Sequence, residues 1–228
     1  MTVENEMVRD VEIPAGDEIQ LNGELRLPKD APGLVVFAHG SGSSRFSPRN
    51  QAVAEKIREF GIGTLLFDLL TKDEEAVDIY TRHLRFDIGL LASRLVAVAG
   101  WLSEQTDTQN LRIGFFGSST GGGAALVAAS KLGERIGAVV SRGGRPDLAG
   151  DALPIVTAPT LMIVGELDDV VIELNRSAIA RMHCETELKI IPGATHLFEE
   201  PGALDLVADL AGEWFGKHLR FEAAAAHA

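Results

Sequence analysis

The nine residues Phe115-Phe116-Gly117-Ser118-Ser119-Thr120-Gly121-Gly122-Gly123 decide how this 228-residue chain is interpreted. They contain the pattern Gly-x-Ser-x-Gly with Ser119 at its centre, between an apolar run and an alanine-rich segment. A strand that turns abruptly into a helix strains the residue at the tip, and small residues two positions before and after it let the chains pass. Gly117 and Gly121 occupy those positions. The stretch predicts a nucleophilic serine at Ser119.

The composition excludes several classes of protein. With 46% hydrophobic residues, the chain can bury one large core, and no Pro/Gly/Ser-rich linker divides it. We expect a single domain over residues 1–228 with a core at about 19–219, followed by an Ala-rich tail at 221–228. The net charge of -12 and the lack of Lys/Arg-rich stripes argue against binding to nucleic acid or to an anionic membrane.

The N-terminal residues are acidic, and they lack the basic and apolar regions of a signal peptide. No apolar run approaches the length that spans a bilayer. We therefore expect a soluble, cytoplasmic protein. Cys184 is the single cysteine, which excludes an internal disulfide and any multi-cysteine metal site.

Short β-rich runs alternate with longer helical patterns, as is typical of a mostly parallel sheet with helices on both faces. The expected strands are Ile19–Leu27, Leu34–Ala38, Thr64–Asp68, Ile113–Phe116, Ala138–Ser141, Thr160–Val164 and Leu188–Ile191. The expected helices are Pro48–Phe60, Phe86–Ser103, Thr120–Leu132, Ile172–Met182 and Ala203–His218. These elements predict an α/β fold with a sheet of seven to eight strands.

A serine nucleophile needs a base, most often a histidine that a carboxylate orients. His196 follows the last expected strand, where it can reach over the sheet toward Ser119. Asp168 follows the strand before it, with Asp169 and Asp147 as competitors for the same role. The order Ser119, Asp168, His196 is the one that α/β-hydrolases use. His39 is interpreted as a structural residue that shapes its loop.

An oxyanion hole needs two donors about 2.7–3.1 Å from the developing charge. We expect one to be the backbone amide of Thr120, directly after the nucleophile. The loop His39-Gly40-Ser41-Gly42 follows the strand ending at Ala38 and offers the second, with the Ser41 amide first and the Gly42 amide next. Asp68, at another strand exit, is expected to line the pocket or to anchor this loop.

With these residues placed, the chain resembles an α/β-hydrolase of the dienelactone hydrolase-like group from about Ile19 to Leu219. The resemblance rests on His39-Gly40-Ser41-Gly42, Gly117-Ser118-Ser119-Thr120-Gly121, Gly165-Glu166-Leu167-Asp168 and Gly193-Ala194-Thr195-His196. The chain is also similar to hydrolase domains fused behind a phosphoribosyltransferase domain.

The resemblance implies a serine-hydrolase triad, with no metal and no organic cofactor. Dienelactone hydrolases proper carry cysteine where this chain has Ser119, so dienelactone is a doubtful substrate. A small-molecule ester or thioester is the expected substrate. Thioester hydrolysis or acyl transfer by the same triad stays an alternative, as does a non-catalytic ligand-binding protein on the hydrolase fold. A phosphate-binding loop at Gly117–Gly123 is disfavoured, because no Gly-Lys-[Ser/Thr] ending follows.

The surroundings of the site are less readable. Only residues 143–158 separate two expected strands where many α/β-hydrolases insert a lid, so we expect an open site without a large lid domain. The connection Leu70–Arg85 is interpreted as a solvated loop, with a partial cover as the alternative. Arg142 and Arg145 either receive a substrate carboxylate or pair with Asp147 or Asp151, and the sequence does not choose between these roles.

Overall fold

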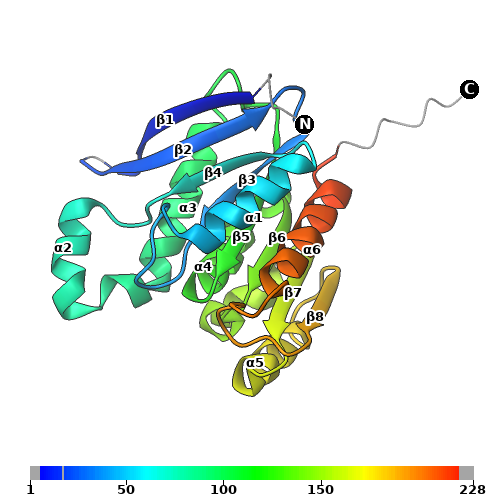
Figure 1. Cartoon of the computed structure of the whole chain (residues 1–228). Helices are drawn as coiled ribbons and strands as arrows, with labels where there is room; N and C mark the ends of the chain where they lie inside the picture. The colour runs from blue at the N-terminus through cyan, green and yellow to red at the C-terminus, as the bar shows by residue number, and fades with distance from the viewer. Residues whose placement is uncertain (1–5, 17, 221–228) are drawn as a thin grey trace, which may run out of the picture.

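The computed structural model describes residues 6–16 and 18–220. Within this part of the chain, eight strands form one sheet in the order β1-β2-β4-β3-β5-β6-β7-β8 (Figure 1). The pairs β1–β2 and β2–β4 are antiparallel, and all the other neighbouring strands are parallel. The strands are β1 (Glu6–Pro14), β2 (Gln20–Pro28), β3 (Gly33–Ala38), β4 (Gly63–Phe67), β5 (Arg112–Ser118), β6 (Ile136–Arg142), β7 (Thr160–Gly165) and β8 (Thr186–Ile191).

Helices cover both faces of the sheet, with α1 and α6 on one face and α3 and α4 on the other (Figure 1). The α-helices are α1 (Pro48–Glu59), α2 (Lys72–Thr81), α3 (Ile88–Leu102), α4 (Thr120–Leu132), α5 (Asp169–Ile179) and α6 (Ala203–His218). Short 3-10 segments are η1 (Leu84–Phe86), η2 (Gly133–Arg135) and η3 (Pro146–Ile155). In the part of the chain that the structure describes, no helix combines the length and the apolar character needed to cross a membrane.

The central strands are buried on both sides, which explains their continuous apolar sequences. Every residue of β3, β4, β6 and β7 is buried. One apolar cluster fills the space under α3 and α4, and a second lies under α1 and α6. The two layers fix the carboxyl ends of the parallel strands at one edge of the sheet, where ligands bind in open α/β folds.

The expected α/β fold is confirmed, and the expected strands and helices lie within about three residues of the observed ones. Strand β1 was not expected from the sequence, and it pairs with β2 along all nine of its residues. Val11 and Ile13 are buried while their neighbours Glu12 and Pro14 are exposed. This alternation of two apolar residues is too short to stand out from an acidic N-terminal segment. The Ala-rich tail at 221–228 lies outside the described residues.

The interpretation of Leu70–Arg85 as a solvated loop was also wrong. Residues 72–81 form α2, which projects from the body of the molecule at the left of Figure 1. The helix has no apolar stripe, and Asp78 is its one buried residue. A capping box starts the helix, since Thr71 accepts from the Glu74 amide and the Glu74 side chain accepts from the Thr71 amide. The pattern Thr-x-x-Glu was the overlooked signal.

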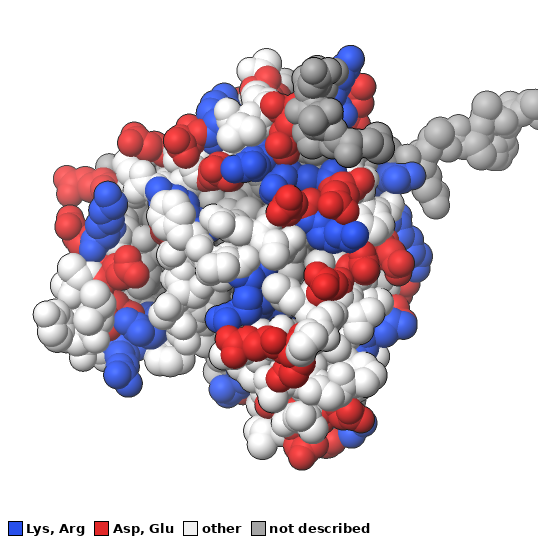
Figure 2. Space-filling model, in the orientation of Figure 1, with Lys and Arg blue, Asp and Glu red and all other residues white. Residues whose placement is uncertain are grey.

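Within residues 6–16 and 18–220, no large lid interrupts the strand edge, as expected. The connection from β6 to β7 holds only η3, which breaks at Gly150 and packs on α4. On the face of the molecule shown in Figure 2, acidic and basic side chains are interspersed rather than gathered into a basic stripe.

Candidate active site

Ser119 lies at the sharp turn between β5 and α4. Its φ of 51° and ψ of -119° are unusual for a residue with a side chain and cost about 1–3 kcal/mol. A Cβ atom on Gly117 would lie 2.5 Å from the carbonyl oxygen of Gly121. One on Gly121 would lie 2.1 Å from the carbonyl oxygen of Ala38. The two glycines of the motif are therefore sterically required by this turn.

The two serines of the turn have different surroundings. Ser118 is 3% exposed, and its hydroxyl donates to Oδ1 of Asn50 on α1 at 3.2 Å. Ser119 is bound through its backbone amide, which donates to the carbonyl oxygen of Arg142 at 3.2 Å. The structure thus uses the side chain of Ser118 to fasten the turn to α1, while the Ser119 side chain has no such partner among the described residues.

His196 and Asp168 meet at the carboxyl edge of the sheet. Nδ1 of His196 lies 2.6 Å from Oδ2 of Asp168. Because a carboxylate only accepts, this contact places the proton on Nδ1 and leaves Nε2 as an acceptor. The histidine side chain is 40% exposed and the aspartate side chain 17% exposed. Asp168 therefore fixes the orientation of the imidazole ring through Nδ1, while the opposite edge of the ring, which carries Nε2, stays accessible.

The loops that carry these two residues are locked together. The Leu167 amide donates to the carbonyl oxygen of Ala194 at 2.9 Å. A Cβ on Gly165 would lie only 2.3 Å from that same oxygen. Phe198 anchors the histidine loop with a 1% exposed side chain and a left-handed φ of 56°. These contacts fix the approach of the imidazole to the strand edge.

Gly143 brings the histidine close to the serine turn. A Cβ on Gly143 would lie 3.4 Å from Cε1 of His196, so the imidazole rests against this glycine. Gly143 directly follows Arg142, whose carbonyl oxygen accepts a hydrogen bond from the Ser119 amide. Among the described residues no hydrogen bond joins the Ser119 hydroxyl to His196, and catalytic contacts are often longer before substrate binds.

The competing carboxylates have other places. Asp169 is the first residue of α5. Asp147 accepts two hydrogen bonds from Arg145, at 2.8 and 2.7 Å. Of the three acidic residues considered for the histidine, Asp168 is the one in contact with it.

The loop after β3 packs directly on the serine turn. A Cβ on Gly40 would lie 3.3 Å from Cβ of Ser119, so the loop backbone almost touches this serine. The Ser41 amide does not face open space, because it donates to Oγ1 of Thr120 at 3.0 Å. The Thr120 amide, at the first position of α4, has no acceptor within its helix. Gly42 has a φ of 71°, and its amide belongs to the same loop.

His39 has the structural role expected for it. Nδ1 donates to the Gly40 carbonyl oxygen at 3.0 Å, and Nε2 accepts from the Leu69 amide at 3.1 Å. Both contacts require the neutral ring with its proton on Nδ1. Burial lowers the pKa of His39 below its ordinary value, which keeps the ring neutral. The residue therefore joins the loop after β3 to the end of β4.

Asp68 anchors the far end of this loop. It accepts from the Arg45 amide at 2.9 Å and forms an ion pair with the Arg45 guanidinium. The guanidinium also stacks over Phe46, 4.4 Å from the ring centroid. Of the two roles expected for Asp68, the structure shows both, since the residue also lines the pocket beside the loop.

Arg142, the last residue of β6, and Arg145, in the segment after it, have different surroundings. Arg145 pairs with Asp147. Arg142 is 8% exposed, and its Nη1 has no hydrogen-bond partner among the described residues. Burial, together with the charge of Arg49, lowers the pKa of Arg142 to about 10, so the group stays charged at neutral pH. Arg145 is thus neutralised, whereas Arg142 is a buried positive charge with no counterion in the part of the chain that the structure describes.

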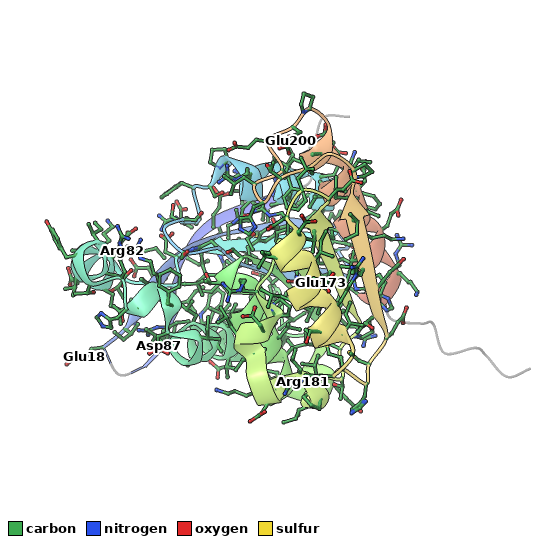
Figure 3. All side chains as sticks on the ribbon, turned by 90° about the horizontal axis from the view of Figure 1, so that it is seen from below. Glu18, Arg82, Asp87, Glu173, Arg181 and Glu200 are labelled. Carbon is green, nitrogen blue, oxygen red and sulfur yellow. The ribbon has the colours of Figure 1, made fainter. Side chains whose placement is uncertain are left out.

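A pocket lies between the loop after β3 and the segment of α2 and η1. Ser41, Gly42 and Thr120 line one side, and Asp78 and Arg85 line the other. Sequence interpretation missed the second side because it assigned no structure there. In Figure 3, Arg82, at the end of α2, and Glu200, in the loop that carries the histidine, lie on different sides of the molecule.

Comparison with known proteins places this geometry in a family. A family model described as the dienelactone hydrolase family matches residues 21–220. Two curated relatives from Mycobacterium tuberculosis strains, each named "Putative phosphoribosyl transferase", are 56% identical to this chain over 210 residues. The match covers 92% of this chain but 46% of each relative. The chain therefore spans about half the length of the curated relatives that it matches.

Solved structures are similar along nearly the whole chain. A dienelactone hydrolase from Anabaena variabilis is 58% identical, with a TM-score of 0.93, over 95% of this chain and 100% of that one. Est1E from Butyrivibrio proteoclasticus has a TM-score of 0.76 over 92% of this chain and 98% of its own, at 20% identity. At that identity the likeness shows the fold alone.

Proposed function

Because this chain belongs to the dienelactone hydrolase family, we propose that it is a serine hydrolase that cleaves a small carboxylic ester or thioester. The proposal rests above all on the 2.6 Å contact between His196 and Asp168 at the strand edge that also carries Ser119. The two residues are 28 positions apart and belong to different loops. A hydroxyl, an imidazole and a carboxylate in this chain order are the components of an α/β-hydrolase triad.

In the first half of the proposed reaction, the Ser119 oxygen attacks the substrate carbonyl carbon while Nε2 of His196 takes the hydroxyl proton. Asp168 holds the ring in the required tautomer and stabilises its charged form. The carbonyl π electrons move to oxygen, and the Thr120 amide at the start of α4 stabilises that charge. His196 then protonates the leaving alcohol or thiol, and acyl-Ser119 remains.

In the second half, a water molecule replaces the leaving group. His196 takes a proton from the water as it attacks the acyl carbon, and the same stabilisation applies to the second oxyanion. Collapse of this intermediate breaks the bond to Ser119, whose oxygen regains a proton from His196. The products are a carboxylic acid and the original enzyme.

Arg142 is the proposed receptor for a carboxylate elsewhere on the substrate. It is the last residue of β6, next to Gly143, which supports the imidazole, and its buried charge has no counterion among the described residues. Replacing Arg142 with Gln should lower the hydrolysis of carboxylate-bearing esters relative to neutral ones, because the paired donors are lost. Arg145→Gln, which removes an arginine already bound to Asp147, is the control. An unchanged preference in Arg142→Gln would exclude this role.

The name of the curated relatives does not conflict with the proposal. This chain matches 46% of each relative, so more than half of each relative lies outside the match. We propose that the matched part is the hydrolase part of those proteins. A transferase activity would then belong to the other part of their length.

The direct test uses the two neighbouring serines as a matched pair. Purified wild-type protein, Ser119→Ala and Ser118→Ala are compared on a panel of p-nitrophenyl esters and acyl thioesters. The proposal predicts hydrolysis by the wild type and by Ser118→Ala, and loss in Ser119→Ala by about 1,000-fold or more. Full activity in Ser119→Ala would refute the triad. Transfer to an added alcohol instead of water would identify an acyltransferase.

A further inference from the structure

Thr120 carries a hydroxyl that the mechanism above does not use. The residue is 3% exposed, and its Oγ1 accepts the Ser41 amide at 3.0 Å across 79 positions of sequence. That amide was the expected second donor of the oxyanion hole. In the structure this amide donates to the Thr120 side chain, so it is not free to act as the second donor of the oxyanion hole.

The hydrogen-bond capacity of the hydroxyl suggests an answer. A threonine hydroxyl has one proton to donate and two lone pairs to accept. The Ser41 amide occupies one lone pair, and among the described residues the proton has no acceptor. Leaving a buried donor unsatisfied costs about 1–3 kcal/mol. Thr120 lines the pocket beside the loop after β3, so its hydroxyl proton is available to an acceptor bound in that pocket.

The position of the hydroxyl matches the place where negative charge develops. Cα–Cβ bonds in a helix tilt toward its N-terminus, and Thr120 is the first residue of α4. Its side chain therefore lies on the same side as its own free amide and the Ser119 turn. Gly40, next to Ser41, approaches Ser119 so closely that a Cβ there would lie 3.3 Å from the serine Cβ. The hydroxyl, the free amide and the nucleophile thus share one small region.

We propose that the Thr120 hydroxyl is the second donor of the oxyanion hole, with the Ser41 amide bonded behind it. This inference rests on the proposed serine hydrolase function. As the Ser119 oxygen bonds to the carbonyl carbon, the displaced π pair on the carbonyl oxygen accepts from both the amide and the hydroxyl of Thr120. No proton leaves Thr120. Accepting the Ser41 amide polarises the hydroxyl and strengthens it as a donor.

Two substitutions at Thr120 test the proposal. Thr120→Val keeps the shape and removes the hydroxyl, while Thr120→Ser keeps the hydroxyl and removes a methyl group. The valine variant should lose about 100- to 1,000-fold in kcat with KM close to the wild-type value, as when one oxyanion donor is removed. The serine variant should keep most of the activity. If the Ser41 amide instead served the oxyanion directly, Thr120→Val would release it and would be as fast as Thr120→Ser or faster.

A transition-state analogue gives a second readout. A trifluoromethyl ketone that adds to Ser119 carries the oxyanion, so its Ki should rise in Thr120→Val by the same factor by which kcat/KM falls. Unequal factors would assign Thr120 a merely structural role. Thermal unfolding checks that both variants fold, and Thr120→Ala, which also lacks the hydroxyl, replaces the valine variant if that one does not.

The two proposals fail in different ways. A wild type without ester or thioester hydrolysis, or one unaffected by Ser119→Ala, would refute the hydrolase function. An active wild type that needs Ser119, with Thr120→Val equal to Thr120→Ser, would refute only the role of the Thr120 hydroxyl.

Discussion

The two sides of the proposed active site are held in different ways. On the side of the serine turn and the histidine loop, backbone meets backbone with no room for a side chain. A Cβ on Gly121 would lie 2.1 Å from the carbonyl oxygen of Ala38 at the end of β3, and one on Gly165 would lie 2.3 Å from that of Ala194. This side depends on glycines and on the ends of buried strands.

On the opposite side, polar side chains hold α2 to α3 and to η1. Arg94 reaches Glu74 at 2.5 Å, and the buried Asp78 pairs with Arg85. Large apolar side chains point outward there, including Ile79 at 60% and Tyr80 at 88% exposure. Steric contacts fix the first side and polar contacts hold the second. We therefore expect most substitutions on the first side to lower activity or stability strongly, and most substitutions on the α2 side to have small effects.

The largest expected effect comes from the carboxylate on the first side. Asp168→Asn should lower kcat by about 10,000-fold, because the histidine loses the partner that fixes its tautomer. Asp169→Asn is the control, since that residue starts α5 and does not contact His196 in the structure. Ester hydrolysis measures both. Equal losses in the two variants would remove Asp168 from the triad.

The next effect is on stability. Gly121→Ala should lower the free energy of unfolding by more than about 4 kcal/mol, because its Cβ overlaps the backbone at Ala38. Gly100→Ala in α3 is the matched control, since a Cβ there meets no atom within 4 Å. It should raise stability by about 0.5–1 kcal/mol through helix propensity. Denaturant unfolding compares them, and similar values would contradict the steric account of the turn.

His39 lies between the two sides, where it joins the loop after β3 to the end of β4, and its contribution to stability depends on pH. Burial lowers its pKa in the folded state, so the unfolded chain binds a proton near pH 6.5 that the folded chain does not. Stability should fall as the pH falls below about 6.5, by at most about 1.4 kcal/mol per pH unit from this residue. His39→Asn lacks this titration. If the difference in unfolding free energy between the wild type and His39→Asn stayed constant from pH 7 to 5, this prediction would be contradicted.

The smallest effect is expected on the α2 side. Thr71→Ala removes the helix cap and should cost about 1 kcal/mol locally. Amide hydrogen exchange in residues 72–81 should become faster, while global unfolding and ester hydrolysis change little. A large loss of global stability would show that α2 is part of the cooperative core, and the contrast between the two sides would disappear.

The same contrast explains what the sequence could predict. Ser119 and Asp168 follow the buried strands β5 and β7, His196 follows the less buried β8, and parallel strands bring such positions to one edge. The glycine spacing around Ser119 also has a single steric reason. These features depend on local patterns, so one sequence is enough to locate them.

The other features depend on side chains that meet across long stretches of chain. Helix α2 buries an aspartate instead of an apolar stripe, so its sequence has no apolar periodicity that would predict a helix. Only the capping box at Thr71 indicates the helix. Nothing in the sequence indicates that the Ser41 amide bonds to Thr120, 79 residues away. Likewise, only the structure separates Arg145, which pairs with Asp147, from Arg142, which has no ion-pair partner among the described residues.

The central claim is that Ser119 is a nucleophile activated by His196. Its most direct test is labelling with a fluorophosphonate probe, followed by mass spectrometry of the modified peptide. The account predicts stoichiometric modification of Ser119, none in Ser119→Ala, and slow labelling in His196→Ala, which retains the serine but not the base. A wild-type protein that stays unlabelled, or one modified at Ser118 instead, would contradict it.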